Sequence, residues 1–211
     1  MNMTIGIVAR DYDSFQSISK NNLKYLHNKC NYIGILNYDN YGLIDTNILD
    51  LCDGIIIPGG SDIYPYHFYI LDYAYNNNIP VLGICMGEQI IGLYANHEEE
   101  KDLIKVENHN DSNMRHWINI KENTILHKIF GDTLEVNSRH LYKLEHINKP
   151  FIVSAKAEDD TIEAIEYVDD NHFIIGVQFH PEDLDNTEAL YNYFLKEVLI
   201  RKMKLENKNE E

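Results

Sequence analysis

The sequence predicts an α/β fold in which most strands run parallel. In the first hundred residues, short and wholly apolar runs alternate with helix-compatible segments, which is typical of parallel strands that are buried on both faces. After about residue 100 the runs become shorter, and several alternate apolar with polar residues, as in residues 162–167. That alternation indicates antiparallel strands with one face in water. We therefore expect a small antiparallel extension in the second half of the chain.

The first half is predicted to supply the parallel strands. The four apolar runs cover residues 3–8, 31–36, 52–57 and 79–84. Between the last two, apolar side chains recur at helical spacing through residues 68–78, and a polar, helix-compatible stretch separates the first two. Strand, helix, strand units of this kind cross over with one hand and build a parallel sheet. The prediction is a doubly wound, flavodoxin-like sheet with flanking helices.

The second half is predicted to add short strands and a closing helix. The strands cover residues 115–120, 133–136, 151–156, 161–168 and 173–179. The helix spans about residues 186–203, with an apolar stripe along one side. We assign residues 1–203 to a single domain, and we expect the charged tail, residues 204–211, to be frayed.

Composition limits the classes of partner. The 211 residues include 18 Lys and Arg against 34 Asp and Glu, a net charge of −16, so phosphate backbones and anionic lipid surfaces would be repelled. No apolar run approaches the roughly 18 residues of a membrane span, and the N-terminus lacks a signal-peptide pattern. Three cysteines without CxxC spacing argue against a disulfide framework. We expect a cytoplasmic protein with no nucleic-acid or membrane partner.

The segment 83–93 holds the first candidate for chemistry. An apolar strand leads into Cys85, glycines lie two positions away on each side, and a helical run follows. This pattern predicts a strand-to-helix elbow that presents a sulfur nucleophile at a helix N-terminus, where free N–H groups and the helix dipole favour a thiolate. A small buried core cysteine fits the same position equally well when this segment is taken alone.

A second segment favours the nucleophile. Residues 174–182 form an apolar strand that runs directly into His180, Pro181 and Glu182. Histidine can take the thiol proton and return it to a leaving amine, while a carboxylate fixes the histidine tautomer. On its own, His180 would fit a surface histidine. Together with Cys85 and Glu182 it completes a nucleophile, base and orienting carboxylate.

Together these two segments resemble the class I glutamine amidotransferase superfamily, in its γ-glutamyl-γ-aminobutyrate hydrolase-like branch of the peptidase C26 type. Residues 58–65 are similar to the glycine turn and Asp-x-x-Pro extension of that branch. Residues 135–140 resemble its Asn-Ser-x-His segment, and residues 157–166 resemble its acidic turn and following strand. The similarity covers nearly the whole chain in the same order. It implies hydrolysis of a γ-glutamyl amide through a glutamyl thioester.

Carried over residue by residue, the resemblance implies that Cys85 is the nucleophile, His180 the general base and acid, and Glu182 the orienting carboxylate. It also implies an oxyanion hole made by the backbone N–H groups of Gly60 and Met86. The residues that it implies for binding the glutamyl group are Gly59, Gln89, Asn137, Ser138, Arg139 and His140. It implies no cofactor.

Some residues depart from the pattern of the branch. Met86 stands where Arg is common after the cysteine, and His140 is followed by Leu141 and Tyr142 instead of His and Gln. The loop after the Asp-x-x-Pro extension is nearly absent. These changes lie on the leaving-group side, so the sequence does not fix a γ-aminobutyrate leaving group, and we expect a more open cleft. If the leaving group is anionic, cations such as Arg115, Arg139 or Lys143 must gather locally.

The other cysteines and histidines are predicted to have no role in chemistry. Cys30 and Cys52 are interpreted as core thiols. The remaining histidines, among them His97, His109, His116 and His127, show no HxH or HExxH spacing, so we expect no metal site.

Three functions remain open from the sequence. The first is a stand-alone hydrolase that releases glutamate from a small-molecule γ-glutamyl conjugate. Its leaving group is γ-aminobutyrate, another small amine, or a nucleotide-linked phosphoramidate of the kind handled in capsule modification. The second is the glutaminase subunit of a two-chain amidotransferase, which would supply ammonia to a partner synthase. The third is a degenerate binding protein, which an intact Cys85, His180 and Glu182 argue against. A homodimer is left open.

Overall fold

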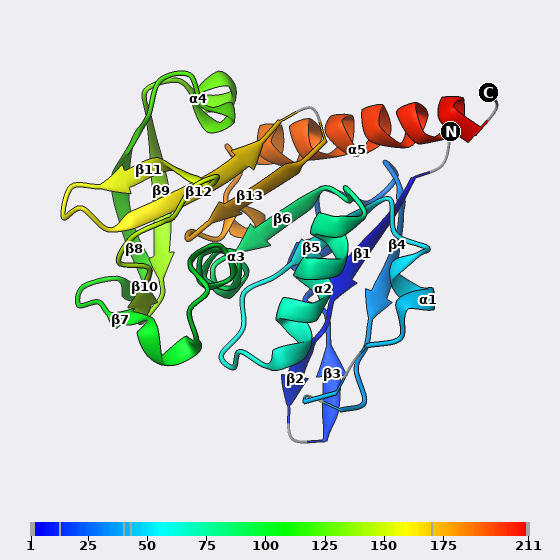
Figure 1. Ribbon diagram of the computed structural model, residues 1–211. Coiled ribbons are helices and arrows are strands. Elements are labelled where there is room, and N and C mark those ends of the chain that lie inside the picture. Colours follow the sequence, from blue (N-terminus) through cyan, green and yellow to red (C-terminus); the bar gives the residue numbers. More distant parts are fainter. Residues whose placement is uncertain (1–2, 13, 40, 43, 170, 210–211) are drawn as a thin grey trace.

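A nine-stranded sheet forms the centre of the computed structural model, which describes residues 3–12, 14–39, 41–42, 44–169 and 171–209 (Figure 1). Five strands form its parallel half, in the order β4 (Asn31–Ile35), β1 (Thr4–Val8), β5 (Gly54–Ile57), β6 (Val81–Ile84) and β13 (Phe173–Val177). Four strands continue it as an antiparallel half, in the order β12 (Ile162–Val168), β11 (Ile152–Ala157), β8 (Asn110–Ile120) and β9 (Thr133–Arg139). The predicted fold class is confirmed, and the antiparallel extension is part of the same sheet.

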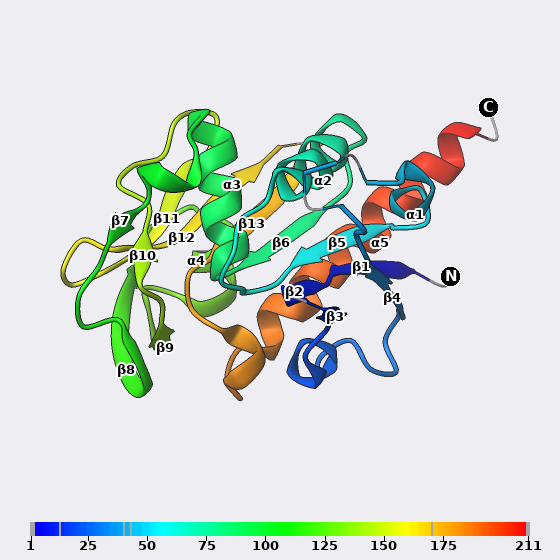
Figure 2. The same cartoon turned by 90° about the horizontal axis from the view of Figure 1, so that it is seen from below.

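The helices cover both faces of the sheet. Figure 2 shows α2 (Pro65–Asn76) and α3 (Met86–Asn96) on one face and α5 (Glu188–Asn209) on the opposite face. Shorter helical segments lie in the connections: α1 (Thr46–Leu49), α4 (Ile125–Phe130), and the 3-10 turns Lys20–Leu23, Glu100–Asp102 and Pro181–Asp183. The two-sided cover explains why the inner strands β5, β6 and β13 are apolar throughout, whereas the edge strand β4 begins with exposed Asn31 and Tyr32.

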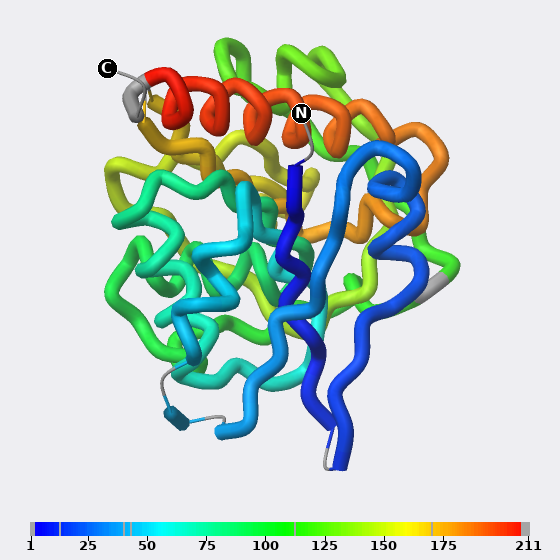
Figure 3. Tube along the Cα trace, turned by 90° about the vertical axis from the view of Figure 1, so that its right-hand side faces the viewer, coloured from blue at the N-terminus to red at the C-terminus, as the bar shows by residue number. Residues whose placement is uncertain are grey.

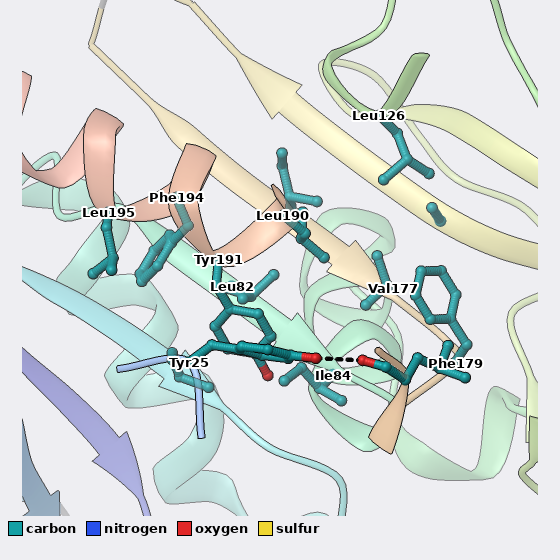
Figure 4. Packing of buried hydrophobic residues seen from close by; sticks show 14 of the residues in the cluster. Tyr25, Leu82, Ile84, Leu126, Val177, Phe179, Leu190, Tyr191, Phe194 and Leu195 are labelled. Atoms are coloured by element: carbon teal, nitrogen blue, oxygen red, sulfur yellow. Dashed lines mark hydrogen bonds between the residues drawn. The ribbon is translucent and has the colours of Figure 1, made fainter. Parts of the chain in front are cut away.

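Two hydrophobic cores follow from this cover. Along β5, Ile55 and Ile57 belong to the core under α2 and α3, whereas Ile56 belongs to the core under α5, because successive side chains point to opposite faces. In the core under α5, the hydroxyl of Tyr25 donates a hydrogen bond to the carbonyl of Leu184 (Figure 4). This bond ties the first crossover to the segment that follows β13.

The crossover from β1 to β4 differs from the helix-compatible segment that we expected. It contains a hairpin of β2 (Arg10–Tyr12) and β3 (Phe15–Ser17) followed by a 3-10 turn. Figure 3 shows this hairpin in blue, projecting from the body of the molecule. A second small ribbon pairs β7 (Ile104–Lys105) with β10 (Tyr142–Lys143). Both ribbons are too short for a periodic signal in the sequence.

The closing helix begins near the predicted residue but continues beyond residue 203 to Asn209. Lys204, Leu205 and Glu206 are good helix formers, which accounts for the continuation into the segment that we expected to be frayed. Residues 210 and 211 of that tail lie outside the described residues. Within the described part of the chain, no helix combines the length and apolar character that crossing a membrane requires.

Candidate active site

Cys85 occupies a sharp turn between β6 and α3. Its backbone has φ 53° and ψ −104°, a region that side chains other than glycine rarely adopt. Its N–H donates to the carbonyl of Val177, 2.8 Å away on β13. A Cβ at Gly87 would lie 2.0 Å from the carbonyl oxygen of Ile57, and one at Gly83 would lie 2.6 Å from that of Gly87. The flanking glycines are therefore required for the elbow.

The elbow places the sulfur at the start of α3. The first N–H groups of a helix have no partner within the helix, and the dipole adds positive potential there. Met86 begins this helix, and Gly60 follows the end of β5; both residues line the same cavity as Cys85. This position suits backbone donors to an oxyanion, although their role stays a prediction.

His180 and Glu182 follow the end of the neighbouring strand β13. The imidazole Nδ1 of His180 lies 2.8 Å from Oε1 of Glu182, and both side chains are buried. A Cβ at Gly59 would lie 2.8 Å from Cε1 of His180 and 3.3 Å from Cβ of Cys85. The side chains of Cys85 and His180 therefore lie close together beside Gly59. The structure thus brings together the three side chains that we predicted as nucleophile, base and orienting carboxylate.

The surroundings of His180 favour its charged form. Burial opposes protonation, but hydrogen bonds to Cys85 and Glu182 outweigh it and raise the pKa of His180 to about 9. The imidazole is therefore protonated at neutral pH and can donate a proton to a leaving group. By contrast, burial raises the pKa of the Cys30 thiol to about 11 and that of the Cys52 thiol to about 12; Cys52 lies in the core as expected, whereas Cys30 is only partly buried at its edge.

Asn137 holds the backbone of His180 in place. Its Nδ2 donates to the carbonyl of His180 at 2.8 Å, and its Oδ1 accepts from the N–H of His180 at 2.7 Å. Asn137 is buried on β9, in the antiparallel half, so two hydrogen bonds tie that half of the sheet to the base. Nothing in the pattern around residue 137 predicts this contact.

A cavity of about 460 Å³ opens above Cys85. Its walls carry several charged and polar side chains: Arg10, Asp11, Tyr12, Asp62, His67, Arg139, Glu182 and Asp183. Of the cations expected from the sequence, Arg139 lines the cavity and forms an ion pair with Asp183, whereas Arg115 is exposed elsewhere and Lys143 contacts Thr161.

Arg10 also lines the cavity, but the sequence analysis did not predict it. It follows the end of β1, the edge where sites in parallel sheets gather, and that placement is the signal that could have found it.

Several predicted substrate-binding residues use their side chains elsewhere. Gln89 donates to the carbonyl of Tyr142 at 2.9 Å and to Gln178 at 3.0 Å. Ser138 and His140 are buried and contact His109 instead of the cavity. Gly59 and Arg139 do line the cavity. The contacts of all these residues with a glutamyl group stay predictions.

Glu88 was also missed by sequence reasoning. It lies in the first turn of α3 with no exposed surface, and neither carboxylate oxygen has a hydrogen-bond partner among the described residues. Burial, with Glu163 and Cys85 nearby, raises its pKa well above the usual range. Its Cγ lies close to Gly176, since a Cβ there would be 2.9 Å away. The small residue on β13 is what admits this side chain.

Comparison with known proteins finds relatives among glutamine amidotransferase-like proteins and CTP synthases. The family model for Peptidase C26 matches residues 66–182, just over half of the chain. A glutamine amidotransferase-like protein of Rickettsia prowazekii is 30% identical, covering 67% of this chain and 74% of the relative. The CTP synthase of Thermotoga maritima is also 30% identical, over 74% of this chain but only 36% of that enzyme.

The fold has solved counterparts as well. The glutaminase domain of the Trypanosoma brucei CTP synthase matches with a TM-score of 0.67 over 95% of both chains, at 18% sequence identity. A glutamine amidotransferase of Thermotoga maritima matches with a TM-score of 0.60 over 96% of this chain and 86% of that one, at 14% identity. At those sequence identities, the similarity to the two solved structures concerns the fold alone.

The classification rests on the family match and the Rickettsia relative, and the geometry of the site agrees with it. The chain belongs to the Peptidase C26 family, within the class I glutamine amidotransferase superfamily.

Proposed function

We propose that this chain is a hydrolase that cleaves the γ-glutamyl C–N bond of a small-molecule conjugate and releases glutamate. Family membership supports an amidohydrolase-type enzyme. The observation that carries the finer proposal is the meeting of Cys85, His180 and Glu182 at the floor of a cavity with two guanidinium groups in its wall.

The proposed reaction has two steps. The sulfur of Cys85 attacks the γ-glutamyl carbonyl, and the developing oxyanion is held by backbone N–H groups at Gly60 and Met86. The C–N bond breaks as His180 gives its proton to the leaving nitrogen, which leaves a glutamyl thioester. Water then attacks the thioester, His180 takes a proton from that water, and the C–S bond breaks to release glutamate and restore the Cys85 thiolate beside the protonated His180. Glu182 holds the imidazole in position throughout.

Two guanidinium groups, set among carboxylates in the cavity wall, support an anionic leaving group, and that of Arg139 also pairs with Asp183. The Nε atoms of Arg10 and Arg139 are buried without hydrogen-bond partners among the described residues. Guanidinium groups bind carboxylate and phosphate oxygens through pairs of N–H donors. A volume of about 460 Å³ is within the range of ligand pockets, which leaves room for more than a glutamyl group. Both γ-aminobutyrate and a phosphoramidate carry such an anion.

A panel of conjugates tests this proposal. Glutamate release would be measured for glutamine, γ-glutamyl-γ-aminobutyrate, a γ-glutamyl amine without an anion, and a γ-glutamyl phosphoramidate. We expect the conjugates with an anionic leaving group to have the highest kcat/KM. Equal turnover of the neutral amine would contradict the role given to the two arginines, and glutamine as the best substrate would contradict the hydrolase itself.

A second candidate is the glutaminase component of a two-chain amidotransferase. The CTP synthase relative favours it, because this chain covers only about a third of that enzyme, as an amidotransferase part would. Such a component should turn over glutamine only when a partner synthase is present. Glutamine hydrolysis that rises on adding a co-purified synthase would favour this candidate over the first.

A further inference from the structure

A buried cluster of three histidines and a glutamate lies outside the active-site cavity. His109 precedes β8 and His140 follows β9, and these two residues face each other across the strand pair. Glu163 lies on β12, and His116 lies on β8. His109, His140 and Glu163 are 5%, 3% and 0% exposed. Residues far apart in the sequence therefore meet in the antiparallel half, which is why sequence spacing predicted no metal site.

The facing atoms have the separations of a metal coordination shell. Nδ1 of His109 lies 3.1 Å from Nε2 of His140 and 3.6 Å from Oε1 of Glu163, and that oxygen lies 3.7 Å from Nε2 of His140. Ligands at the usual zinc distances, about 2.0–2.2 Å, are about 3.3–3.6 Å apart in a tetrahedron. The three edges lie close to that value, and these three atoms belong to one group within 4.8 Å.

The outer nitrogens of both imidazoles are already committed as donors. Nδ1 of His140 lies 3.0 Å from the carbonyl of Tyr142, which can only accept, and Nε2 of His109 lies 3.1 Å from the half-exposed carboxylate of Asp159. With neutral rings, both inward nitrogens therefore present lone pairs to each other. A shared proton or a metal ion would satisfy both lone pairs, and hydrogen-bonded outer nitrogens are the outer-shell pattern found around metal-binding histidines.

The carboxylate side of the cluster also indicates a missing partner. Oε2 of Glu163 and Nδ1 of His116 are buried without hydrogen-bond partners among the described residues. Nε2 of His116 lies 3.0 Å from Oε1 of Glu163 and can donate to it, as expected for a residue that orients a ligating carboxylate. Ser138 Oγ lies 3.0 Å from Nδ1 of His109, within reach of the same centre.

We propose that His109, His140 and Glu163 bind a divalent first-row transition metal, and that Zn²⁺ fits the site best. Two imidazoles and one carboxylate suit zinc better than calcium or magnesium, which prefer oxygen ligands. Because the ligands come from the ends of β8 and β9 and from β12, the metal would clamp the two hairpins of the antiparallel half together. Asn137 and Arg139 lie on β9 just before His140, so the clamp fixes the wall of the active-site cavity.

The test uses the full chain, stripped with a chelator, incubated with Zn²⁺ alone and passed through gel filtration. We expect one zinc ion per chain to remain bound, measured by elemental mass spectrometry, and a thermal midpoint that rises with Zn²⁺. With Co²⁺ as the probe, the visible absorption should be that of a tetrahedral nitrogen and oxygen site, without a thiolate-to-cobalt charge-transfer band. If a thiolate-to-cobalt band were observed, the metal would be bound by Cys85 instead of the histidine cluster.

Matched variants locate the metal. His140→Gln and Glu163→Gln should lose the bound zinc, whereas His180→Gln, which alters the catalytic cluster with Glu182 and Asp183, should keep it. Asp159→Asn, at a half-exposed position where the amide oxygen can still accept from the N–H of Thr161, should weaken zinc affinity by about 10–100-fold. No retained zinc in the wild type, unchanged affinity in Asp159→Asn, or loss of zinc only in His180→Gln would each overturn the proposal.

Discussion

The two halves of the sheet serve the active site in different ways. The parallel half places chemistry directly, since Cys85 follows β6 and His180 and Glu182 follow β13, at the carboxyl ends of adjacent strands. The antiparallel half supplies support, because Asn137 on β9 holds the backbone of His180 and Arg139 lines the cavity. Reactive groups come from strand ends, and their positions are set by side chains from the other half.

Removing the nucleophile should give the largest effect. Cys85→Ala is expected to lower kcat on the order of 10⁶-fold, the typical loss for a triad nucleophile, because no other sulfur nucleophile lines the cavity in the described part of the chain. Cys30→Ala is the matched control, since its partly buried thiol lies outside the cavity and has a raised pKa, and it should retain full activity. Steady-state glutamate release measures both. Residual turnover near wild type in Cys85→Ala would move the chemistry away from the parallel half.

The orienting carboxylate should come second and should change the pH profile. Glu182→Gln is expected to lower kcat by about 10²–10⁴-fold. The activity of the wild type should fall as pH rises through about 9, because the protonated His180 is the acid, and this limb should move to lower pH in the variant. A pH profile of kcat/KM checks both effects. An alkaline limb that stays in place would show that Glu182 does not hold the charge on His180.

The same raised pKa affects stability. A group whose pKa rises from 6.5 to about 9 on folding stabilises the native state fully below pH 6.5 and loses that contribution as pH approaches 9. The thermal midpoint of the wild type should therefore decline between pH 6.5 and 9. The decline should be smaller in Glu182→Gln, and an equal decline in both proteins would contradict the assignment to His180.

Support from the antiparallel half is tested by Asn137→Ala. This variant loses two buried hydrogen bonds to the backbone of His180, so we expect kcat to fall about 100-fold with a small change in KM. Asn119→Ala, on the exposed face of the neighbouring strand β8, is the control and should behave as the wild type. Unchanged kcat in a folded Asn137→Ala protein would remove β9 from the catalytic arrangement.

The smallest effect should come from the cavity wall. Arg139→Met is expected to raise KM about 10-fold for a conjugate with an anionic leaving group, and much less for a neutral one. Arg115→Met removes a cation that is exposed outside the cavity, so its KM should stay unchanged. If both variants change KM alike, the effect belongs to the overall field of the protein and not to a local contact.

Sequence reasoning was most successful in the parallel half. All five of its strands coincide with apolar runs, and the elbow at Cys85 follows from glycines that steric contact makes necessary. In the antiparallel half, the main strands were predicted from alternation, but their partners were not. Pairing there depends on contacts between residues far apart in the sequence, which periodicity does not record.

The candidate site shows the same division. Cys85, His180 and Glu182 could be predicted because short motifs at strand ends determine them. Arg10 and the buried position of Glu88 could not, since the first lies at the start of an unrecognised hairpin and the second depends on Gly176 of another strand. The histidine cluster was missed for the same reason, because His109 and His140 meet only through strand pairing.

Mass spectrometry of the intact protein after brief exposure to a γ-glutamyl conjugate tests the central claim most directly. We predict an added mass of one glutamyl group, mapped to Cys85 by peptide digestion, which persists longer at low pH and is absent in Cys85→Ala. The same experiment on Cys30→Ala should give the adduct unchanged. A substrate that is turned over without any glutamyl adduct, or with an adduct on another residue, would contradict the thioester mechanism proposed for this fold.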